Sequence, residues 1–337
     1  MNGERPVDRE SLHLDDRKLD SVPDWVGGIG SLRELHLDGN LLSSLPPALE
    51  TLSALEVLHL RRNRLESVPE SVSRLTLLRD LRIGKNLLTE IPDWLWDRES
   101  LEFLDLSENR LSSVSPRIGR LTELRMLDLG HNALSSIPEA LGELTRLKDA
   151  LYLSDNRLTA VPESLGNLRE LRYLSITDNE LTSLPETLGR LSKLRELRLY
   201  NNRLEALPET LGGLPDLREI HLAHNRLTSL PESIGELGSL RELRLSNNRI
   251  SSLPESIGNL RRLTDLDLRN NDLTALPESI ARLESLTHLD LRGNRLLSLP
   301  DGIQELPNLE KLDLRWNKLR ASTWIEDLER RGCAVLR

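Results

Sequence analysis

The chain has 337 residues, with 54 acidic against 45 basic side chains, a net charge of −9 and one cysteine. A single cysteine excludes a disulfide framework, no apolar run reaches the roughly 18 residues of a membrane span, and the N-terminal MNGERPVDRE is too polar for a secretory signal. Only 3% of the residues are aromatic, which is low for one large core, and leucine supplies most of the apolar side chains.

Residues 1–10 are polar and are expected to be disordered, and an internal repeat then occupies residues 11–320. Its unit reads LxxLxLxxNxLxxLPxxLGxLxx, as in residues 240–262, and one degenerate copy with Arg17 at the asparagine position comes first, for about 14 units. The interval is 23 residues, except for 24 between the fifth and sixth asparagines. The repeated asparagines are Asn40, Asn63, Asn86, Asn109, Asn132, Asn156, Asn179, Asn202, Asn225, Asn248, Asn271, Asn294 and Asn317.

Each unit predicts a short strand, a turn and a short helical return. The LxL alternation puts both leucines on one side of a strand, and a single such strand cannot bury them, so neighbouring units must stack into a parallel sheet. The asparagine lies where the chain leaves the sheet, and its amide can satisfy backbone groups of the turn, which predicts a polar ladder. The following Leu-Pro step predicts a helical segment of one or two turns with proline at its first position.

The repeat resembles the leucine-rich repeat family from about Leu12 to Asn317, and the 23-residue unit is similar to the intracellular, Ras-group-like and bacterial cytosolic type. The resemblance implies an α/β solenoid: a curved right-handed horseshoe with a parallel β-sheet on its concave face and short 3-10 or α segments on its convex face. It also implies a non-catalytic module that binds other proteins, often around small GTPases.

The last residues, 321–337, are expected to cap the solenoid. Thr323 to Glu326 fits a capping box, the following IEDLERR predicts a helix that stops at Gly332, and residues 333–336 predict a final strand.

Most of the aromatic side chains are expected on the concave face. In a strand of this repeat, the residues six, four and two positions before each asparagine face solvent, and the single Phe, the three Tyr and one of the two Met occupy such positions. Exposed aromatic side chains on a sheet are typical of binding hot spots, whereas the alternative is a cross-strand patch that covers itself. The predicted partner-binding set is Phe103, Met126, Tyr152, Tyr173, Tyr200, Arg198, His221 and Arg244.

Charged columns flank this set on both sides. On the C-terminal side, acidic residues at six and four before the asparagine stand beside Arg269, Arg292 and Arg315, which predicts diagonal ion pairs on a solvated face. On the N-terminal side, His13, His36 and His59 stack in one column. They could bind a metal, but strand stacking rarely gives tetrahedral geometry, so solvated histidines without a metal are favoured.

Three departures from the repeat occur near the aromatic positions. Arg98 replaces an inward leucine where Trp94 and Trp96 appear, Ser115-Pro116 replaces Leu-Pro, and the 24-residue unit adds a residue around residues 148–150. Repair of packing, with Trp96 filling volume, is favoured over a second convex binding surface.

No catalytic, cofactor or nucleic-acid signature is present in the sequence. The single thiol, Cys333, falls in the predicted cap, no glycine-rich phosphate loop occurs, and a pI near 5.5 with interleaved acids leaves no basic stripe. Only about twenty residues follow the last repeat, so the ligase domain of some bacterial relatives is not implied. We therefore predict a monomeric cytoplasmic, non-enzymatic protein-binding solenoid that needs no cofactor and contacts neither membrane nor nucleic acid. The alternatives are a secreted bacterial effector or adaptor that presents a substrate or small GTPase to a separate enzyme, and a structural spacer.

Overall fold

The computed structural model describes residues 10–320 and 324–337, with the side chain of Trp324 left out. The expected disorder of the first residues and the capping role of Thr323 lie outside this range. Contacts divide the chain into two compact units, unit 1 (Met1–Arg157) and unit 2 (Leu158–Arg337), and each is described separately.

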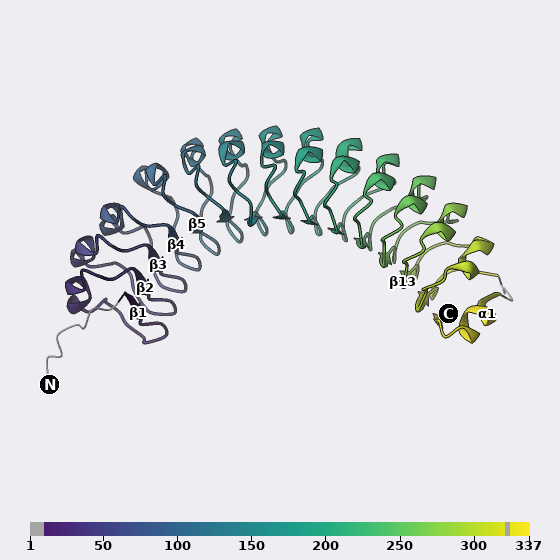
Figure 1. Ribbon diagram of the computed structural model, residues 1–337, viewed down its shortest axis with the longest axis horizontal. Helices are drawn as coiled ribbons and strands as arrows, with labels where there is room; N and C mark the ends of the chain where they lie inside the picture. Colours follow the sequence, from purple (N-terminus) through teal and green to yellow (C-terminus); the bar gives the residue numbers. More distant parts are fainter. Residues whose placement is uncertain (1–9, 321–323) are drawn as a thin grey trace. The chain divides into compact units, whose positions relative to one another are not determined.

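Unit 1 alternates three-residue strands with five-residue 3-10 helices (η). Its strands pair in parallel in chain order, and they lie along one side of the unit with the helices along the other (Figure 1). The elements are β1 (Ser11–His13), η1 (Asp24–Gly28), β2 (Glu34–His36), η2 (Pro47–Thr51), β3 (Val57–His59), η3 (Glu70–Arg74), β4 (Asp80–Arg82), η4 (Asp93–Asp97), β5 (Phe103–Asp105), η5 (Pro116–Arg120), β6 (Met126–Asp128), η6 (Glu139–Glu143) and β7 (Ala150–Tyr152).

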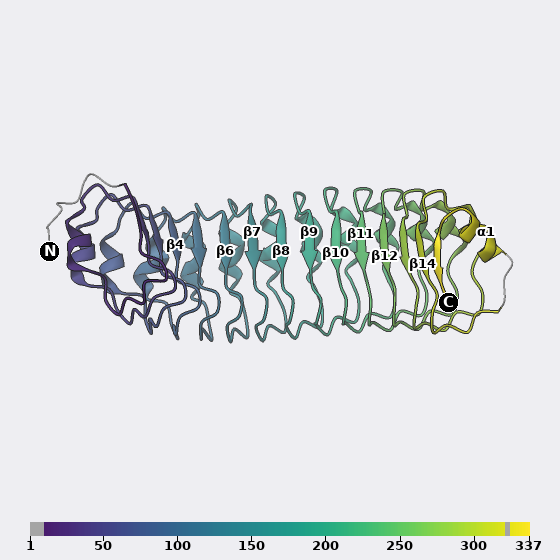
Figure 2. The same ribbon diagram turned by 90° about the horizontal axis from the view of Figure 1, so that it is seen from below.

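Unit 2 continues the same alternation and ends in an α-helix and a strand. Its strands also pair in parallel in chain order (Figure 2). The elements are η7 (Glu163–Asn167), β8 (Tyr173–Ser175), η8 (Glu186–Arg190), β9 (Glu196–Arg198), η9 (Glu209–Gly213), β10 (Glu219–His221), η10 (Glu232–Glu236), β11 (Glu242–Arg244), η11 (Glu255–Asn259), β12 (Asp265–Asp267), η12 (Glu278–Arg282), β13 (His288–Asp290), η13 (Asp301–Glu305), β14 (Lys311–Asp313), α1 (Trp324–Arg330) and β15 (Ala334–Leu336).

Leucine and other aliphatic side chains fill the space between the strands and the 3-10 helices. The central residue of each strand from β2 to β14 is at most 2% exposed, as Leu104 and Leu243 illustrate. Because the central side chain of each strand points into the core, its two flanking residues point to the opposite side, which we call the strand face. Most of these flanking residues are partly exposed, whereas Asp105, Ala150, Ser175 and Asp313 are buried. The predicted α/β solenoid of parallel strands and short 3-10 segments is confirmed.

The repeated asparagines join each unit of the repeat to the one before it. Asn202 is typical: its Nδ2 donates to the carbonyl oxygens of Ile176 at 2.8 Å and Leu199 at 3.1 Å, and its Oδ1 accepts the N–H of Leu181 at 3.0 Å. Ten of the thirteen are buried, so each such hydrogen bond contributes on the order of 1 kcal/mol and its loss would leave a buried backbone group unpaired.

The residue before each repeated asparagine has a positive φ, between 50° and 69°. It is a glycine only before Asn40 (Gly39) and before Asn294 (Gly293), and the other eleven turns use a non-glycine residue. Asp178 (φ 54°) and Lys85 (φ 55°) illustrate the non-glycine cases. Most of these residues are polar, as expected for a turn that points side chains to solvent.

Proline stands one position earlier than the sequence predicts. In η9, for example, Pro208 is the residue before the helix, with φ −66° and ψ 144°, and Glu209 is the first helical residue. The fixed φ of proline suits an extended residue as well as a helical one, so it ends the incoming extended segment instead of beginning the helix.

Candidate functional site

The predicted binding residues of unit 1 lie side by side on its strand face. Phe103 pairs with Met126 across β5 and β6, and Met126 pairs with Ala150 across β6 and β7. Phe103, Met126 and Tyr152 are all half-buried. The guanidinium of Arg125 lies 5.2 Å from the centre of the Phe103 ring, and it forms ion pairs with Glu102 and Asp149. We call Phe103, Met126, Tyr152 and Arg125 the first aromatic cluster.

The predicted residues of unit 2 form a second group on its own strand face. Arg198 of β9 lies 5.4 Å from the centre of the Tyr173 ring in β8, and its Nε donates to Glu196 at 2.5 Å. Burial works against the charge of Arg198, but the hydrogen bond to Glu196 and the nearby phenols raise its pKa above the usual value. Tyr200 follows β9 and is half-buried. We call Tyr173, Tyr200 and Arg198 the second aromatic cluster.

His221 and Arg244 continue this face along β10 and β11. They pair in register with each other and each faces an acid of its own strand, Glu219 at 3.5 Å from His221 and Glu242 in a hydrogen bond with Arg244. His221 and Arg244 thus lie on neighbouring strands of this face, and the structure shows the acidic side chain that each one contacts.

Two carboxylates next to the first aromatic cluster are unexpected. Asp105 is fully buried, and it accepts hydrogen bonds from Arg61, two strands away, and from the Ser107 hydroxyl at 2.6 Å. Gly84 occupies the intervening turn, where a Cβ would stand 2.8 Å from an Asp105 oxygen. The missing side chain leaves room for Arg61 to reach Asp105.

The neighbouring carboxylate, Asp128, lacks such an arginine pair. Burial raises its pKa to about 6, helped by the charge of Asp105, although the backbone N–H of Gly130 donates to its Oδ1 at 2.9 Å and opposes the shift. Asp128 therefore changes charge near neutral pH beside Met126 and Tyr152.

The charged columns of unit 2 pair along strands and not mainly across them, contrary to expectation. Arg315 donates to both oxygens of Asp313, at 3.0 and 2.6 Å, and the same pairing joins Arg292 to Asp290 at 3.1 Å. One longer diagonal contact, 3.8 Å, joins Arg292 to Asp313. The reason is geometric, since residues two apart on one strand point the same way and an arginine can fold back onto its neighbour.

This part of the face is also less solvated than predicted. Strands β11 to β14 border a hollow of about 300 Å³, and its lining includes Asp290, Asp313, Arg292 and Lys311. Asp313 is only 2% exposed; burial alone would raise its pKa, but hydrogen bonds from Arg315 and the charge of Arg292 hold it below the usual value. Burial raises the pKa of Asp290, against the hydrogen bond from the Arg292 N–H.

The histidine column of unit 1 is stacked, as predicted, but only its first member is well solvated. The ring centres of His13 and His36 are 4.2 Å apart with the planes at 19°, and those of His36 and His59 are 4.5 Å apart, edge to face. The side chain of His13 is 64% exposed, against 17% for His36 and 14% for His59. Burial, followed by the charges of His59 and His13, lowers the pKa of His36.

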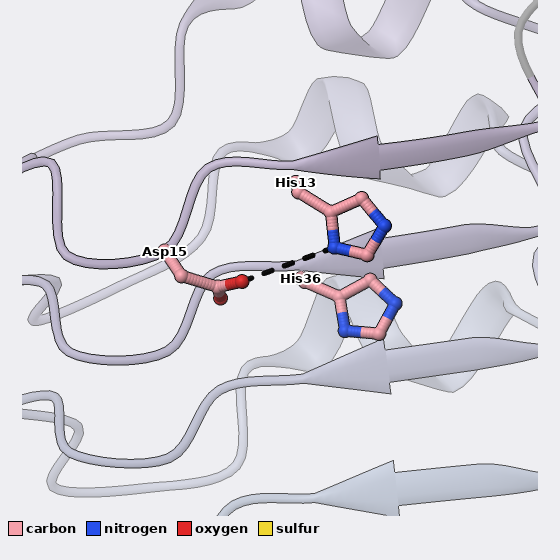
Figure 3. A group of neighbouring side chains, drawn as sticks. All are labelled: His13, Asp15 and His36. Carbon is pink, nitrogen blue, oxygen red and sulfur yellow. Dashed lines mark ion pairs between the residues drawn. The ribbon is translucent and has the colours of Figure 1, made fainter.

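Asp15 lies beside these histidines, and the sequence analysis did not include it in the group. Its carboxylate comes close to ring nitrogens of His13 and His36, with the three ligand atoms within 4.8 Å of one another (Figure 3). The signal was available, because Asp15 lies two residues after His13 and therefore on the same side of the strand.

The three departures from the repeat are accommodated within unit 1. Trp96 is 1% exposed and fills the interior, as the repair interpretation predicts, while Arg98 lies 5.8 Å from the centre of the Trp94 ring and donates to the Ser73 carbonyl oxygen. Ser115 caps η5, its hydroxyl accepting the N–H of Arg117 at 3.2 Å.

The additional residue of the 24-residue unit lies just before β7. The N–H groups of Lys148 and Asp149 both donate to the Arg125 carbonyl oxygen, at 3.2 and 2.9 Å. In the other repeats of unit 1 the equivalent pair is one position closer to the asparagine, as with Arg79 and Asp80. The extra residue is thus absorbed ahead of the strand, and Tyr152 keeps its place on the strand face.

The single thiol does not have the environment of a nucleophile. Cys333 is 5% exposed, and burial raises its pKa, which lowers the thiolate fraction at neutral pH. Over residues 10–320 and 324–337, no helix has both the length and the apolar character to span a bilayer.

Sequence comparison matches this chain to repeat families over most of its length. The family described as leucine-rich repeat region matches residues 150–247 and 232–330, and the family described as leucine rich repeat matches residues 30–88, 53–111 and 99–158. No sequence among curated proteins matches significantly.

Solved structures of several other proteins have a fold similar to that of this chain. A leucine-rich repeat protein of Leptospira interrogans is 29% identical with a TM-score of 0.76, over 97% of this chain and 95% of that one. An internalin of Listeria monocytogenes is 22% identical with a TM-score of 0.78, over 93% and 87% of the two chains, which shows the fold alone. A TDR receptor is 26% identical with a TM-score of 0.80, over 97% of this chain but 63% of the receptor chain.

Proposed function

Because the chain belongs to the leucine-rich repeat family, whose fold is typically a non-catalytic protein-interaction module, we propose that it binds a partner protein on its strand face. The binding residues in this proposal are the first aromatic cluster in unit 1, and the second aromatic cluster with His221 and Arg244 in unit 2.

The observation that carries this proposal is that aromatic side chains lie half-buried on a face that otherwise carries mostly charged and polar residues. Phe103 and Tyr173 each have one arginine near the ring, Arg125 and Arg198. Aromatic and arginine side chains are enriched at binding hot spots because they bury a large area, and tyrosine and arginine also keep a polar group for hydrogen bonds. The core is already filled by leucine and needs no aromatic residues from the strand face.

The chemistry of the face favours a protein partner with both apolar and charged groups. Arg125 is held by Glu102 and Asp149, and Arg198 is held by Glu196, so each guanidinium is oriented before a partner arrives, which reduces the ordering cost of binding. We propose further that the protein is a monomer in the cytoplasm of a bacterium; the 29% identity to the Leptospira protein supports the bacterial origin.

A second candidate function is an adaptor that presents a substrate or a small GTPase to a separate enzyme. The observation that favours it is the charged hollow of β11 to β14, which lies on different strands from Tyr173 and Tyr200 and would provide a second binding surface. An adaptor requires two partners bound at once, whereas a simple binding module requires one.

Substitution of the aromatic residues tests the main proposal. The partner is first identified by affinity capture from the source cells and purified, and its dissociation constant is then measured by calorimetry. We expect Phe103→Ala and Tyr173→Ala each to weaken binding at least tenfold, since a buried aromatic hot spot is worth about 2 kcal/mol or more.

The matched controls are Trp25→Ala and Leu77→Ala, which remove large side chains that are 50% and 52% exposed away from the strand face. Unchanged affinity in both aromatic variants, with intact folding by circular dichroism, would refute the proposed binding site. Simultaneous binding of two proteins, one of them lost in Arg292→Ala, would favour the adaptor.

A further inference from the structure

The side chains of His13, Asp15 and His36 form a compact group at strands β1 and β2. His13 and His36 pair in register on neighbouring parallel strands, and their rings stack with centres 4.2 Å apart. Asp15 Oδ2 is 3.9 Å from His13 Nδ1, and one ligand atom from each of the three residues lies within 4.8 Å of the others. Figure 3 shows the Asp15 carboxylate on one side of both rings, with a nitrogen of each ring turned toward it.

Neighbouring groups hold these ligands in place. The Asp38 N–H donates to Asp15 Oδ1 at 2.7 Å, which fixes the carboxylate and leaves Oδ2 facing His13. The Ser11 hydroxyl is 3.1 Å from His13 Nε2, and Glu34 is 3.7 Å from His36 Nε2. The Ser11 contact is a hydrogen bond on the far side of the His13 ring, of the kind that orients a metal-binding histidine, whereas Glu34 is beyond hydrogen-bond distance of His36 Nε2.

We propose that His13, His36 and Asp15 bind one divalent transition-metal ion, with Zn²⁺ as the preferred ion and water in the remaining position. Two imidazole nitrogens and one carboxylate oxygen are a ligand set that Zn²⁺ accepts at 2.0–2.2 Å. Ligands of a tetrahedral ion lie about 3.3 Å apart, so the ligand atoms must approach by about 1 Å. The exposed side chain of His13 has the freedom to make that movement.

His59 is the third member of the column but is not part of this ligand set. Its Nε2 is 3.6 Å from Asp80 of β4, which lies on the other side of His59 from β1 and Asp15. The His59 ring meets the His36 ring edge to face. His59 therefore supports the ring of His36 and leaves the Asp15 side of that ring open.

A comparable group in unit 2, Glu196, Glu219 and His221, does not carry the same inference. The guanidinium of Arg198 donates to Glu196 at 2.5 Å, and a divalent cation would have to displace or repel that charge. The group at β1 and β2 offers two imidazoles where this one offers a single imidazole, which is the stronger set for Zn²⁺.

A bound ion would cross-link strands β1 and β2. These strands are otherwise joined by backbone hydrogen bonds such as Leu14 N–H to His36 O at 2.8 Å. Binding to the folded state alone shifts unfolding to higher temperature by mass action.

Calorimetric titration of the untagged full chain with ZnCl₂, in a buffer that does not chelate metals, tests the inference. We expect one equivalent to bind, and affinity to fall at least tenfold in His13→Ala and in Asp15→Asn. Both substitutions lie at partly or largely exposed side chains, and thermal unfolding without zinc verifies the fold. In the parent chain, zinc should raise the unfolding temperature, and this rise should disappear in both variants.

Two control variants separate the proposed ligands from histidine chemistry in general. His288→Ala removes an exposed histidine that also faces an aspartate, Asp265 at 3.5 Å, and should leave zinc affinity unchanged. His59→Gln should change it less than threefold. Absence of stoichiometric binding, or equal affinity in His13→Ala and the parent chain, would overturn the proposal, as would a loss in His59→Gln as large as that in His13→Ala.

Discussion

Asp128 is a carboxylate on the strand face whose charge opposes folding at neutral pH. Its pKa is about 6 in the folded chain against an ordinary value of 3.8, so the folded state holds the proton more tightly than the unfolded state. Between these two values the folded state binds more protons, and stability therefore falls as pH rises through about 4 to 6. The penalty is absent below this range and complete above it.

Replacing Asp128 by Asn should remove that penalty. The amide oxygen can still accept the Gly130 N–H, while the charge is gone. We expect Asp128→Asn to stabilise the chain by up to about 3 kcal/mol at pH 7.5 and to change little at pH 4, since each pKa unit corresponds to about 1.4 kcal/mol. Urea denaturation at the two pH values measures this. A variant that is less stable than the parent at pH 7.5 would contradict the assignment.

The positions of the strand-face residues follow from the repeat in the sequence, but the interactions between their charges do not. Phe103 and Tyr173 were placed by counting back from an asparagine, since the repeat fixes which residues point outward. The Arg61–Asp105 bridge passes over Gly84 and joins residues two strands apart, so it depends on a side chain that is missing in between. The consensus of a single repeat unit does not predict a contact between residues that lie two units apart.

Close packing of successive 3-10 helices depends on a glycine at the same place in many units. At Gly235 of η10, a Cβ would stand 2.4 Å from the Ser256 carbonyl oxygen and 2.7 Å from the Ser256 Cβ in η11. Gly189 and Gly258 meet the following helix in the same way. The repeated glycine therefore sets how near one helix lies to the next.

Gly235→Ala should destabilise unit 2 by about 1–3 kcal/mol, because the backbone of η11 must move to admit the methyl group. Gly238→Ala is the matched control, since its nearest neighbour would be 4.0 Å away. Thermal unfolding of both variants measures the difference. Equal unfolding temperatures would mean that the helices can separate without cost.

The secondary-structure elements were predictable from the sequence because the same pattern of residues recurs in about 14 units. The strands, the 3-10 helices and the asparagine positions all follow from the spacing of Leu, Asn and Pro. The position of proline was predicted one residue late, because its φ is compatible with both an extended and a helical residue. Asp15 was overlooked as a possible ligand, although its place two residues after His13 put it on the same side of the chain.

At the scale of the whole molecule, stability is built from contacts between neighbouring repeats, and those contacts group into two units. In such a chain, the loss of one buried side chain weakens its own neighbourhood most. Leu81 in β4 and Ile220 in β10 are both fully buried strand centres, one in each unit, and provide a matched pair.

Ile220→Ala should lower hydrogen-exchange protection in unit 2 more than in unit 1, and Leu81→Ala should do the reverse. Each removes buried methyl groups at a cost of about 2–5 kcal/mol. The informative amides are Leu222, which donates to Arg244 O in unit 2, and Leu60, which donates to Arg82 O in unit 1. Equal loss at both amides in either variant would indicate a single cooperative transition.

The turn before each repeated asparagine has a further consequence for spectroscopy. Its residue keeps nearly one backbone conformation whether it is Lys85, Asp178 or Trp316. The native thiol of Cys333 is buried, so a cysteine introduced at position 85 or 178 would react with a maleimide dye ahead of it. The scaffold thus provides regularly spaced attachment points with uniform local geometry, suited to fluorescence or spin labels.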